Sequence, residues 1–264
     1  MNAVGGPVVD SLRDLVAAFA EARDPRIGVL SALPESDRST GALLATVLGQ
    51  DIGIGVLARL VRELHARLGE HLLSVDVSDW ARLERACRFA WLAEWPHKDS
   101  LAGWVLAVSD FLRAHGAADA WESNFSAPGE FVGRMARELP WMGSRSPSRI
   151  KGWRLARWMA RGECGAAAWG RDARRELTLP VAAVERGLKT LSLLPAGWES
   201  RTLGSRQGWF DAILSEVAPD DPASAWMPLE TVLARGRSGP ACQERLGSCR
   251  NCPVRSRCPS PGRI

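Results

Sequence analysis

The chain has 264 residues, of which 46% are hydrophobic and 24% are charged. This length and composition are typical of a soluble globular protein with one large or two modest domains. No apolar run approaches the length that spans a membrane, and the N-terminal residues lack the basic and apolar regions of a secretory signal. We therefore expect a cytoplasmic protein that has no membrane partner.

The hydrophobic pattern predicts helices along nearly the whole chain. The first is expected over 8–22, and a long one over 41–69 breaks near Gly49–Gly55, because GQDIGIG is too rich in glycine for a smooth helix. Further helices are expected over 80–95 with Asp79 as its N-cap, over 97–116 and 128–139, over a segment that carries Lys151 to Arg161, over 177–195 with Pro180 at its start, and over 228–239. A shorter helix is expected inside 209–226, with loops over 117–127 and 197–209. No strand-like alternation of useful length occurs, so the predicted fold class is all-α.

The segment LPWMGSRS, residues 139–146, predicts a tight turn between two helices. Gly143 supplies the backbone freedom that such a turn needs. The turn would leave backbone N–H groups at the start of the second helix able to bind a DNA phosphate, although an ordinary αα-hairpin is the alternative. The second helix carries basic residues at three- and four-residue steps that can share one face: Lys151, Arg154, Arg157 and Arg161.

The formal net charge of +4 is small, but the basic residues are unevenly distributed. Residues 134–161 contain eight Lys or Arg against one Glu, and residues 235–264 contain seven Arg against one Glu. Two such blocks in a nearly balanced chain favour a surface that binds a polyanion. They are also compatible with two ordinary solvated surfaces in an Arg-rich proteome.

Four of the six cysteines lie near the C-terminus with the spacing C-x6-C-x2-C-x5-C: Cys242, Cys249, Cys252 and Cys258. Four thiolates at one centre suit zinc or an iron–sulfur cluster. A single C-x2-C pair with two outlying cysteines forms a loop wide enough for a cubane, so we expect a 4Fe–4S cluster rather than a zinc site or two disulfides. Cys87 and Cys164 stand alone in helical segments and are expected to be buried, unreactive thiols.

Together, these features resemble the endonuclease III-like DNA glycosylases of the helix-hairpin-helix superfamily, over roughly residues 40–258. LLATVLGQD (43–51) resembles the family's leucine-rich helix that ends in a glutamine. LTLPVAAVERGLKTLSLL (177–194) resembles its Val-Asp-Thr-His-Val-x-Arg-Val segment, and ETVLARGRSGPAC (230–242) resembles the helix that leads into the cluster loop. Residues 148–161 are also similar to an uncharacterised helix-hairpin-helix family with an Arg-Trp-Met-x-Arg run.

The resemblance implies a six-helix barrel domain containing the helix-hairpin-helix at 39–181, and an iron–sulfur cluster domain formed by 1–38 with 182–264. Double-stranded DNA would be the partner of a monomeric protein, which would be associated with the nucleoid if bacterial. Gln50 would fill the gap left by an extruded base. The implied DNA contacts of the hairpin and the following helix are Leu139, Pro140, Trp141, Met142, Gly143, Ser144, Arg145 and Lys151. The implied activity is the removal of damaged or mispaired bases, with or without AP lyase activity.

Two positions depart from the family's catalytic pattern. The catalytic lysine, two residues after the last glycine of the hairpin, falls on Arg145, which stays protonated and cannot act as an amine nucleophile. The catalytic aspartate falls on Val181, which can neither accept a proton nor stabilise a cation. The nearest alternatives are residue types more usual on surfaces and in ion pairs: Lys151 as the amine and Asp172, Glu176 and Glu185 as acids.

The sequence is therefore compatible with three functions. The first is a divergent DNA glycosylase of base-excision repair. The second is a catalytically degenerate relative that recognises damaged or bent duplex without cleaving the glycosidic bond. The third is an iron–sulfur protein without DNA, which the hairpin and the basic blocks disfavour.

Overall fold

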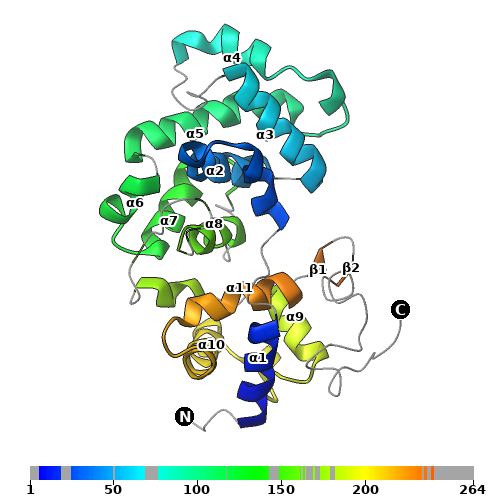
Figure 1. Cartoon of the computed structure of the whole chain (residues 1–264), viewed down its shortest axis with the longest axis vertical. Helices are drawn as coiled ribbons and strands as arrows, with labels where there is room; N and C mark the ends of the chain where they lie inside the picture. The colour runs from blue at the N-terminus through cyan, green and yellow to red at the C-terminus, as the bar shows by residue number, and fades with distance from the viewer. Residues whose placement is uncertain are drawn as a thin grey trace. The chain divides into compact units, whose positions relative to one another are not determined.

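A computed structural model of the chain describes residues 6–18, 25–49, 51–68, 77–116, 118–142, 149–160, 162, 164, 169, 173–178, 182–233, 235–236 and 239–240. Within these residues the backbone is almost entirely helical (Figure 1). The β structure of the described part is one two-residue antiparallel pair of β1 (Arg235–Gly236) and β2 (Gly239–Pro240). The predicted all-α class is confirmed. No helix of the described ranges combines the length and apolar character needed to cross a bilayer.

The chain divides into two compact units, and the two ends of the sequence belong to the same one. Unit 1 consists of Met1–Asp24 with Arg174–Ile264, and unit 2 consists of Pro25–Ala173. The α-helices described in unit 2 are α2 (Arg38–Leu48), α3 (Ile54–Leu68), α4 (Trp80–Ala86), α5 (Leu101–His115), α6 (Ala118–Asn124), α7 (Pro128–Glu138) and α8 (Ile150–Ala160). Its short 3-10 helices are η1 (Pro25–Ala32), η2 (Glu35–Asp37), η3 (Val77–Asp79), η4 (Ala90–Leu92) and η5 (Lys98–Ser100).

The boundaries of these units lie earlier in the chain than the sequence interpretation placed them, after residues 24 and 173 instead of 38 and 181. At the first boundary the reason is packing. η1 lies against α2 and α3, and η2 lies against α2, so residues 25–37 belong with unit 2.

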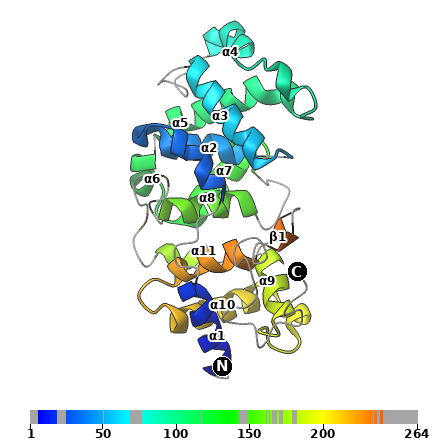
Figure 2. The same ribbon diagram turned by 45° about the vertical axis from the view of Figure 1, so that its right-hand side comes forward.

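α2 is the central helix of unit 2. α3, α5 and α8 pack around it, as both ribbon views show (Figures 1 and 2). Every residue from 41 to 48 is buried, so GALLATVL forms the apolar centre of the unit. The polar side chain in this run, Thr46, donates its hydroxyl to the Ala42 carbonyl oxygen at 2.7 Å. Because α2 is held on all sides, the loop that follows Leu48 starts from a fixed position.

The pair of helices around the predicted hairpin packs closely. Pro128 stands in the first turn of α7, where its fixed φ suits a helix start, and Leu139 becomes extended ahead of Pro140 and ends the helix. α7 lies against α8, and a Cβ placed on Gly152 of α8 would be only 3.0 Å from Val132 Cγ1. The glycine therefore allows the two helices to approach each other.

Unit 1 is built around α11 (Pro222–Leu233). Packed against it are α1 (Gly6–Ala18), α9 (Ala182–Thr190) and α10 (Leu203–Val217), and two 3-10 helices, η6 (Ala173–Thr178) and η7 (Trp198–Ser200), complete the described elements. Trp226 of α11 is fully buried, and its ring lies 4.9 Å from that of Phe210 of α10. Thr202 caps α10 by accepting a hydrogen bond from the Ser205 N–H at 3.2 Å.

Some boundaries of the predicted helices are confirmed, and others differ from those observed. The break near residues 49–55 and the end of α5 at Gly116, with φ of 76°, are confirmed. The helix predicted over 80–95 stops at Ala86. Arg67 of α3 donates to the Ala86 and Arg88 carbonyl oxygens and so satisfies this helix end, and Asp79 makes no side-chain cap bond.

Other differences lie at predicted loops and at the last helix. α6 occupies part of the predicted loop 117–127, anchored by the buried Trp121, which donates to the Gly116 carbonyl oxygen at 2.9 Å. α10 begins inside the predicted loop 197–209, and α11 ends at Leu233, where the sequence pattern predicted helix up to residue 239. In each case contacts between elements outweigh local propensity.

Candidate nucleic-acid interface

The loop after α2 is one of the two segments that the resemblance assigns to DNA. α2 closes with the Gly49 N–H bonded to the Ala45 carbonyl oxygen, and α3 begins at Ile54. Asp51, in between, has φ of 51°, a conformation that costs free energy for residues other than glycine. Gln50, the predicted gap-filling residue, lies outside the described residues.

The other segment that the resemblance assigns to DNA is the hairpin turn LPWM, residues 139–142. Leu139 and Met142 are buried and anchor the turn in unit 2, whereas Trp141 between them is 52% exposed. Trp141 has φ of 58°, which is a strained conformation for a large side chain. Gly143, Ser144 and Arg145 lie outside the described residues, and α8 begins at Ile150.

His97 contacts both segments. Its Nε2 lies 3.2 Å from Asp51 Oδ2, and its ring centroid lies 5.0 Å from that of Trp141. The loop after α2 and the hairpin turn are thus side by side, although Asp51 and Trp141 are far apart in the sequence. His97 was not among the predicted site residues. Its signal in the sequence is the Pro96 break, which places a histidine in a turn between Trp95 and the helix that carries Trp104.

Two buried tryptophans support this junction. Trp95 and Trp104 pack edge to face at 5.6 Å, and His97 lies 5.7 Å from Trp95 and 5.2 Å from Trp104. Trp104 also lies 6.0 Å from Trp141. The result is an aromatic cluster of Trp95, His97, Trp104 and Trp141 with buried rings on the inside and Trp141 on the outside.

The end of α7 is tied to the end of α5 just before the turn. His115 Nε2 lies 2.7 Å from Glu138 Oε2, and Arg134 Nη1 lies 3.2 Å from Glu138 Oε1. Partial burial acts to raise the pKa of Glu138, but the hydrogen bond and charge of His115, followed by those of Arg134, outweigh it and hold this pKa below its ordinary value. The ionised carboxylate therefore stabilises the base of the hairpin.

Two guanidinium groups converge over Gly133 on α7. A Cβ placed on Gly133 would lie 3.4 Å from Arg149 Nη1 and 3.6 Å from Arg137 Nη1, so the two nitrogens are at most 7.0 Å apart. Neither arginine forms an ion pair within the described ranges. Arg149 also has a positive φ, of 42°. Two cations this close, beside the hairpin, favour an anion between them.

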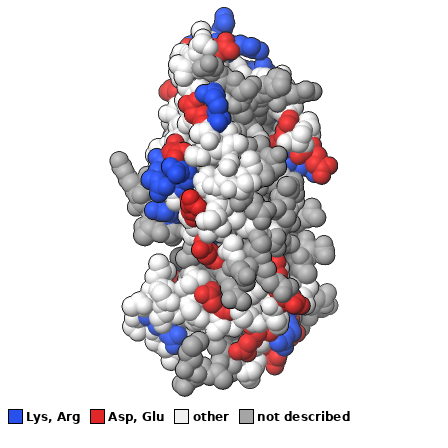
Figure 3. Space-filling model, turned by 90° about the vertical axis from the view of Figure 1, so that its left-hand side faces the viewer, with Lys and Arg blue, Asp and Glu red and all other residues white. Residues whose placement is uncertain are grey.

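The predicted basic face of α8 is not formed as the sequence suggested. Arg157 is 1% exposed, because residues 155–160 are all buried against the rest of unit 2. Lys151 is half-buried with its Nζ atom inside, Arg154 is half-buried, and Arg161 lies outside the described residues. On the face in Figure 3, the described Lys and Arg stand in separate groups, and Asp or Glu lie next to several of them.

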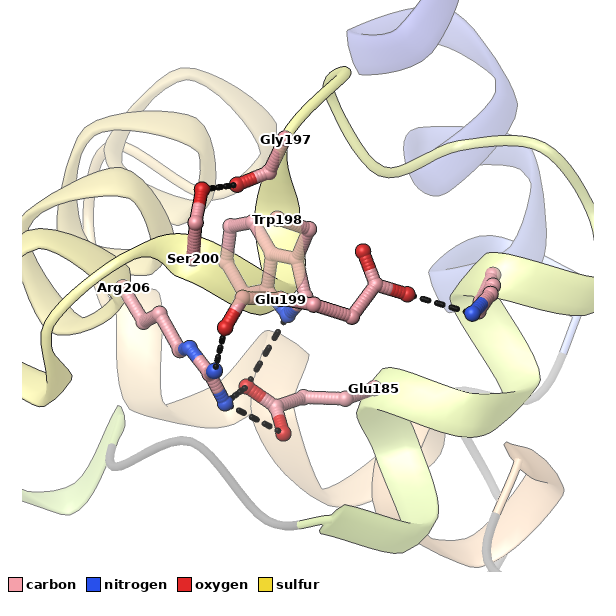
Figure 4. Close-up of polar contacts among 7 residues, drawn as sticks. Glu185, Gly197, Trp198, Glu199, Ser200 and Arg206 are labelled. Carbon is pink, nitrogen blue, oxygen red and sulfur yellow. Dashed lines mark hydrogen bonds and ion pairs between the residues drawn. The ribbon is translucent and has the colours of Figure 1, made fainter.

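Glu185, a candidate acid, lies in unit 1 within a hydrogen-bonded cluster (Figure 4). Its Oε1 accepts a hydrogen bond from Trp198 Nε1 at 3.1 Å, and Arg206 Nη1 lies 3.3 Å and 3.4 Å from its two oxygens. In the same cluster Lys189 pairs with Glu199 and thereby lowers the pKa of that carboxyl. Arg206 also donates to the Glu199 carbonyl oxygen at 3.2 Å. Both carboxylate oxygens of Glu185 therefore hold elements of unit 1 together.

The remaining candidates are less informative. Asp172 and Val181 lie outside the described residues, and Glu176 of η6 is exposed. The cluster ligands Cys242, Cys249, Cys252 and Cys258 also lie outside them. Within the described ranges no three or more His, Cys, Asp or Glu gather as metal ligands.

The two isolated cysteines are buried as predicted, although each lies in a turn and not in a helix. Cys87 and Cys164 are buried, and burial raises the pKa of the Cys87 thiol to about 12, against a smaller opposing effect of Arg67. A thiol with this pKa is almost entirely protonated near neutral pH. Cys87 is therefore a packing residue of unit 2.

No protein-family model, curated protein or solved structure matches this chain.

Proposed function

We propose that the protein is a DNA-binding iron–sulfur protein of the endonuclease III-like type, acting at damaged or mispaired bases in duplex DNA. The observation that carries this proposal is the junction at His97, where the loop after α2 meets the hairpin turn. These are the segments whose sequences resemble the family's gap-filling and hairpin motifs. A protein that probes bases while holding the backbone needs both functions on one surface.

The convergent arginines provide the backbone contact of this proposal. Arg137 and Arg149 place two guanidinium groups beside the hairpin, and guanidinium groups bind phosphate through charge-assisted hydrogen bonds. Residues 134–161 carry a large excess of basic residues, which would hold the polyanion at longer range. Phosphate contacts of this kind position a duplex and carry no sequence information.

The proposed cofactor is a 4Fe–4S cluster held by Cys242, Cys249, Cys252 and Cys258. Its support is the chemistry of the donor set, because four thiolates at short spacing suit iron–sulfur ligation. When bound, the cluster would cross-link this segment and order the arginines it contains, namely Arg245, Arg250, Arg255 and Arg257.

Of the two DNA-binding hypotheses, the residues favour the relative that does not cleave the glycosidic bond. Arg145 and Val181 occupy the positions of the family's lysine and aspartate. Of the candidate acids, Glu185 is engaged with Trp198 and Arg206, and Glu176 is exposed on η6. The protein would then recognise damaged or bent duplex, and would either recruit other proteins to it or protect it.

DNA binding is tested by fluorescence anisotropy with a labelled duplex at about 50 mM and about 200 mM salt. We expect affinity to fall steeply with salt, and Arg137→Ala and Arg149→Ala each to weaken binding on every sequence and to reduce the salt slope by about 1. Arg113→Ala is the matched control, because Arg113 already pairs with Asp110 at 2.8 Å. Absence of binding at the lower salt would overturn the proposal.

Cleavage is tested on duplexes with an abasic site, uracil, an oxidised pyrimidine or mismatched adenine. Alkali treatment reports base release, and borohydride traps a Schiff base. The chain has only three lysines, Lys98, Lys151 and Lys189, so a variant with all three changed to Arg tests every lysine at once. Base release or trapping by the wild type would favour the divergent glycosylase, and neither is expected.

The cofactor is tested on the purified protein by its visible absorption and iron content. A brown protein with broad visible absorption is expected, and Cys252→Ser should remove the colour, whereas Cys87→Ala should keep it. A colourless, zinc-containing protein would contradict the iron–sulfur assignment.

A further inference from the structure

We propose that Trp141, supported by His97, is a stacking surface for a nucleobase that has left the base stack. The inference rests on the proposed DNA-binding function. It deepens that function by naming the part of the ligand that is recognised and the side chain that takes it. The arginines over Gly133 would hold phosphate, and Trp141 would hold the ring of an unpaired base.

Trp141 is presented to solvent by a turn that is otherwise anchored inside unit 2. Its neighbours Leu139 and Met142 are 4% and 1% exposed, whereas Trp141 is 52% exposed. A large residue with φ of 58° is uncommon, and strained conformations of this kind cluster at binding sites. The turn therefore keeps an indole at the surface in a backbone conformation that costs free energy.

One side of the Trp141 ring is already supported. His97 lies 5.0 Å and Trp104 lies 6.0 Å from its ring centroid, and Asp51 holds His97 at 3.2 Å. Trp104 is itself packed against buried Trp95. A ring held on its inner side loses little conformational freedom when a ligand stacks on its outer side, so the surface is preorganised.

The charge around the turn identifies the partner. Trp141 lies within residues 134–161, where eight Lys or Arg stand against one Glu, and the Arg137 and Arg149 guanidinium groups converge nearby in sequence and fold. A ligand that satisfies both cations and an exposed aromatic ring carries anionic groups and planar rings. Single-stranded and locally unpaired nucleic acids have this chemistry, and base–aromatic stacking is how proteins usually hold them.

Trp80 is the matched control. It is also an exposed tryptophan of unit 2, at the start of α4, with 42% exposure. Within the described residues no aromatic ring lies against it, so it lacks the support that Trp141 has.

The experiment measures binding of wild type, Trp141→Ala, Trp141→Phe and Trp80→Ala to two labelled DNAs at low salt. One is an intact duplex, and the other is the same duplex with a single unpaired 2-aminopurine. Thermal unfolding checks that each variant is folded. We expect Trp141→Ala to lose on the order of 10- to 100-fold in affinity for the unpaired base and to keep the wild-type salt slope. Trp141→Phe should retain most of the affinity, and Trp80→Ala should match the wild type.

The 2-aminopurine fluorescence gives a second readout that a merely structural role would not change. Stacking on Trp141 should quench it on binding of the wild type and of Trp80→Ala, and the quenching should be lost with Trp141→Ala at saturating protein. Wild-type affinity and quenching with folded Trp141→Ala would overturn this inference alone, as would an equal loss of affinity for both DNAs. No binding of the wild type to either DNA would overturn the proposed function as well.

Discussion

Asp51 and His97 come from separate turns of unit 2, and their side chains meet at 3.2 Å, with the His97 ring centroid 5.0 Å from that of Trp141. Asp51 has φ of 51° and lies in the loop after α2, whereas His97 follows the Pro96 break before α5. The pair therefore joins two loops that helix packing brings close. A change at either residue should alter how the Trp141 ring is supported.

His97→Ala should weaken DNA binding by roughly 3- to 10-fold, because Trp141 loses the ring on its inner side. Anisotropy with the unpaired-base duplex measures this. His65→Ala is the control, since His65 Nε2 forms a similar pair with Asp37 Oδ2 at 3.0 Å elsewhere in unit 2. Equal loss of affinity in both variants would show that only general stability is involved.

Glu185 should contribute to stability and not to catalysis. Arg206→Ala removes the cation beside a carboxylate whose side chain is 14% exposed, so we expect a loss of about 1–3 kcal/mol in the free energy of unfolding. Adding Glu185→Gln should recover part of it, which a double-mutant cycle by urea unfolding measures. A normal unfolding curve for Glu185→Gln, together with loss of base release, would instead make Glu185 catalytic.

The contact between α7 and α8 should be sensitive to a single methyl group. In Gly152→Ala the new Cβ would lie 3.0 Å from Val132 Cγ1 and 3.3 Å from Met135 Cε, so we expect a loss of about 1–3 kcal/mol. Gly103→Ala in α5 meets nothing within 4 Å and should stabilise the protein by about 0.5–1 kcal/mol. Thermal unfolding of both variants tests the packing directly, and a stabilised Gly152→Ala would contradict it.

Glu138 makes stability depend on pH. Its pKa is lowered in the folded protein, so its contribution is fully present above the ordinary glutamate pKa of about 4.3 and is lost as the pH falls through the lowered value. Glu138→Gln should therefore cost about 0.5–1 kcal/mol at neutral pH, and the deficit should disappear in acid. Melting curves over this range measure it, with Glu94→Gln, an exposed carboxylate of the same unit, as the control. A deficit that persists in acid would point to lost packing instead.

Much of the fold was predictable because it depends on local chemistry. The apolar repeat of α2, the glycines after it, Pro128 at the start of α7 and Gly116 at the end of α5 act within a few residues of their own positions. Where a distant side chain contacts the end of a helix, the local pattern predicted the wrong helix boundary. Arg67 of α3 donates to the Ala86 carbonyl oxygen at the end of α4, and no local signal predicts this contact.

The candidate site was likewise only partly predictable from the sequence. The spacing of the four C-terminal cysteines, the LPWMG turn and the basic block around it can be read from the chain, because motif and charge are properties of sequence. The use of each side chain depends on which neighbours the folded helices supply. Packing buries Arg157 in α8, commits Glu185 to Arg206, and brings His97 against both Asp51 and Trp141, since these partners are separated by many residues and meet only when the helices pack.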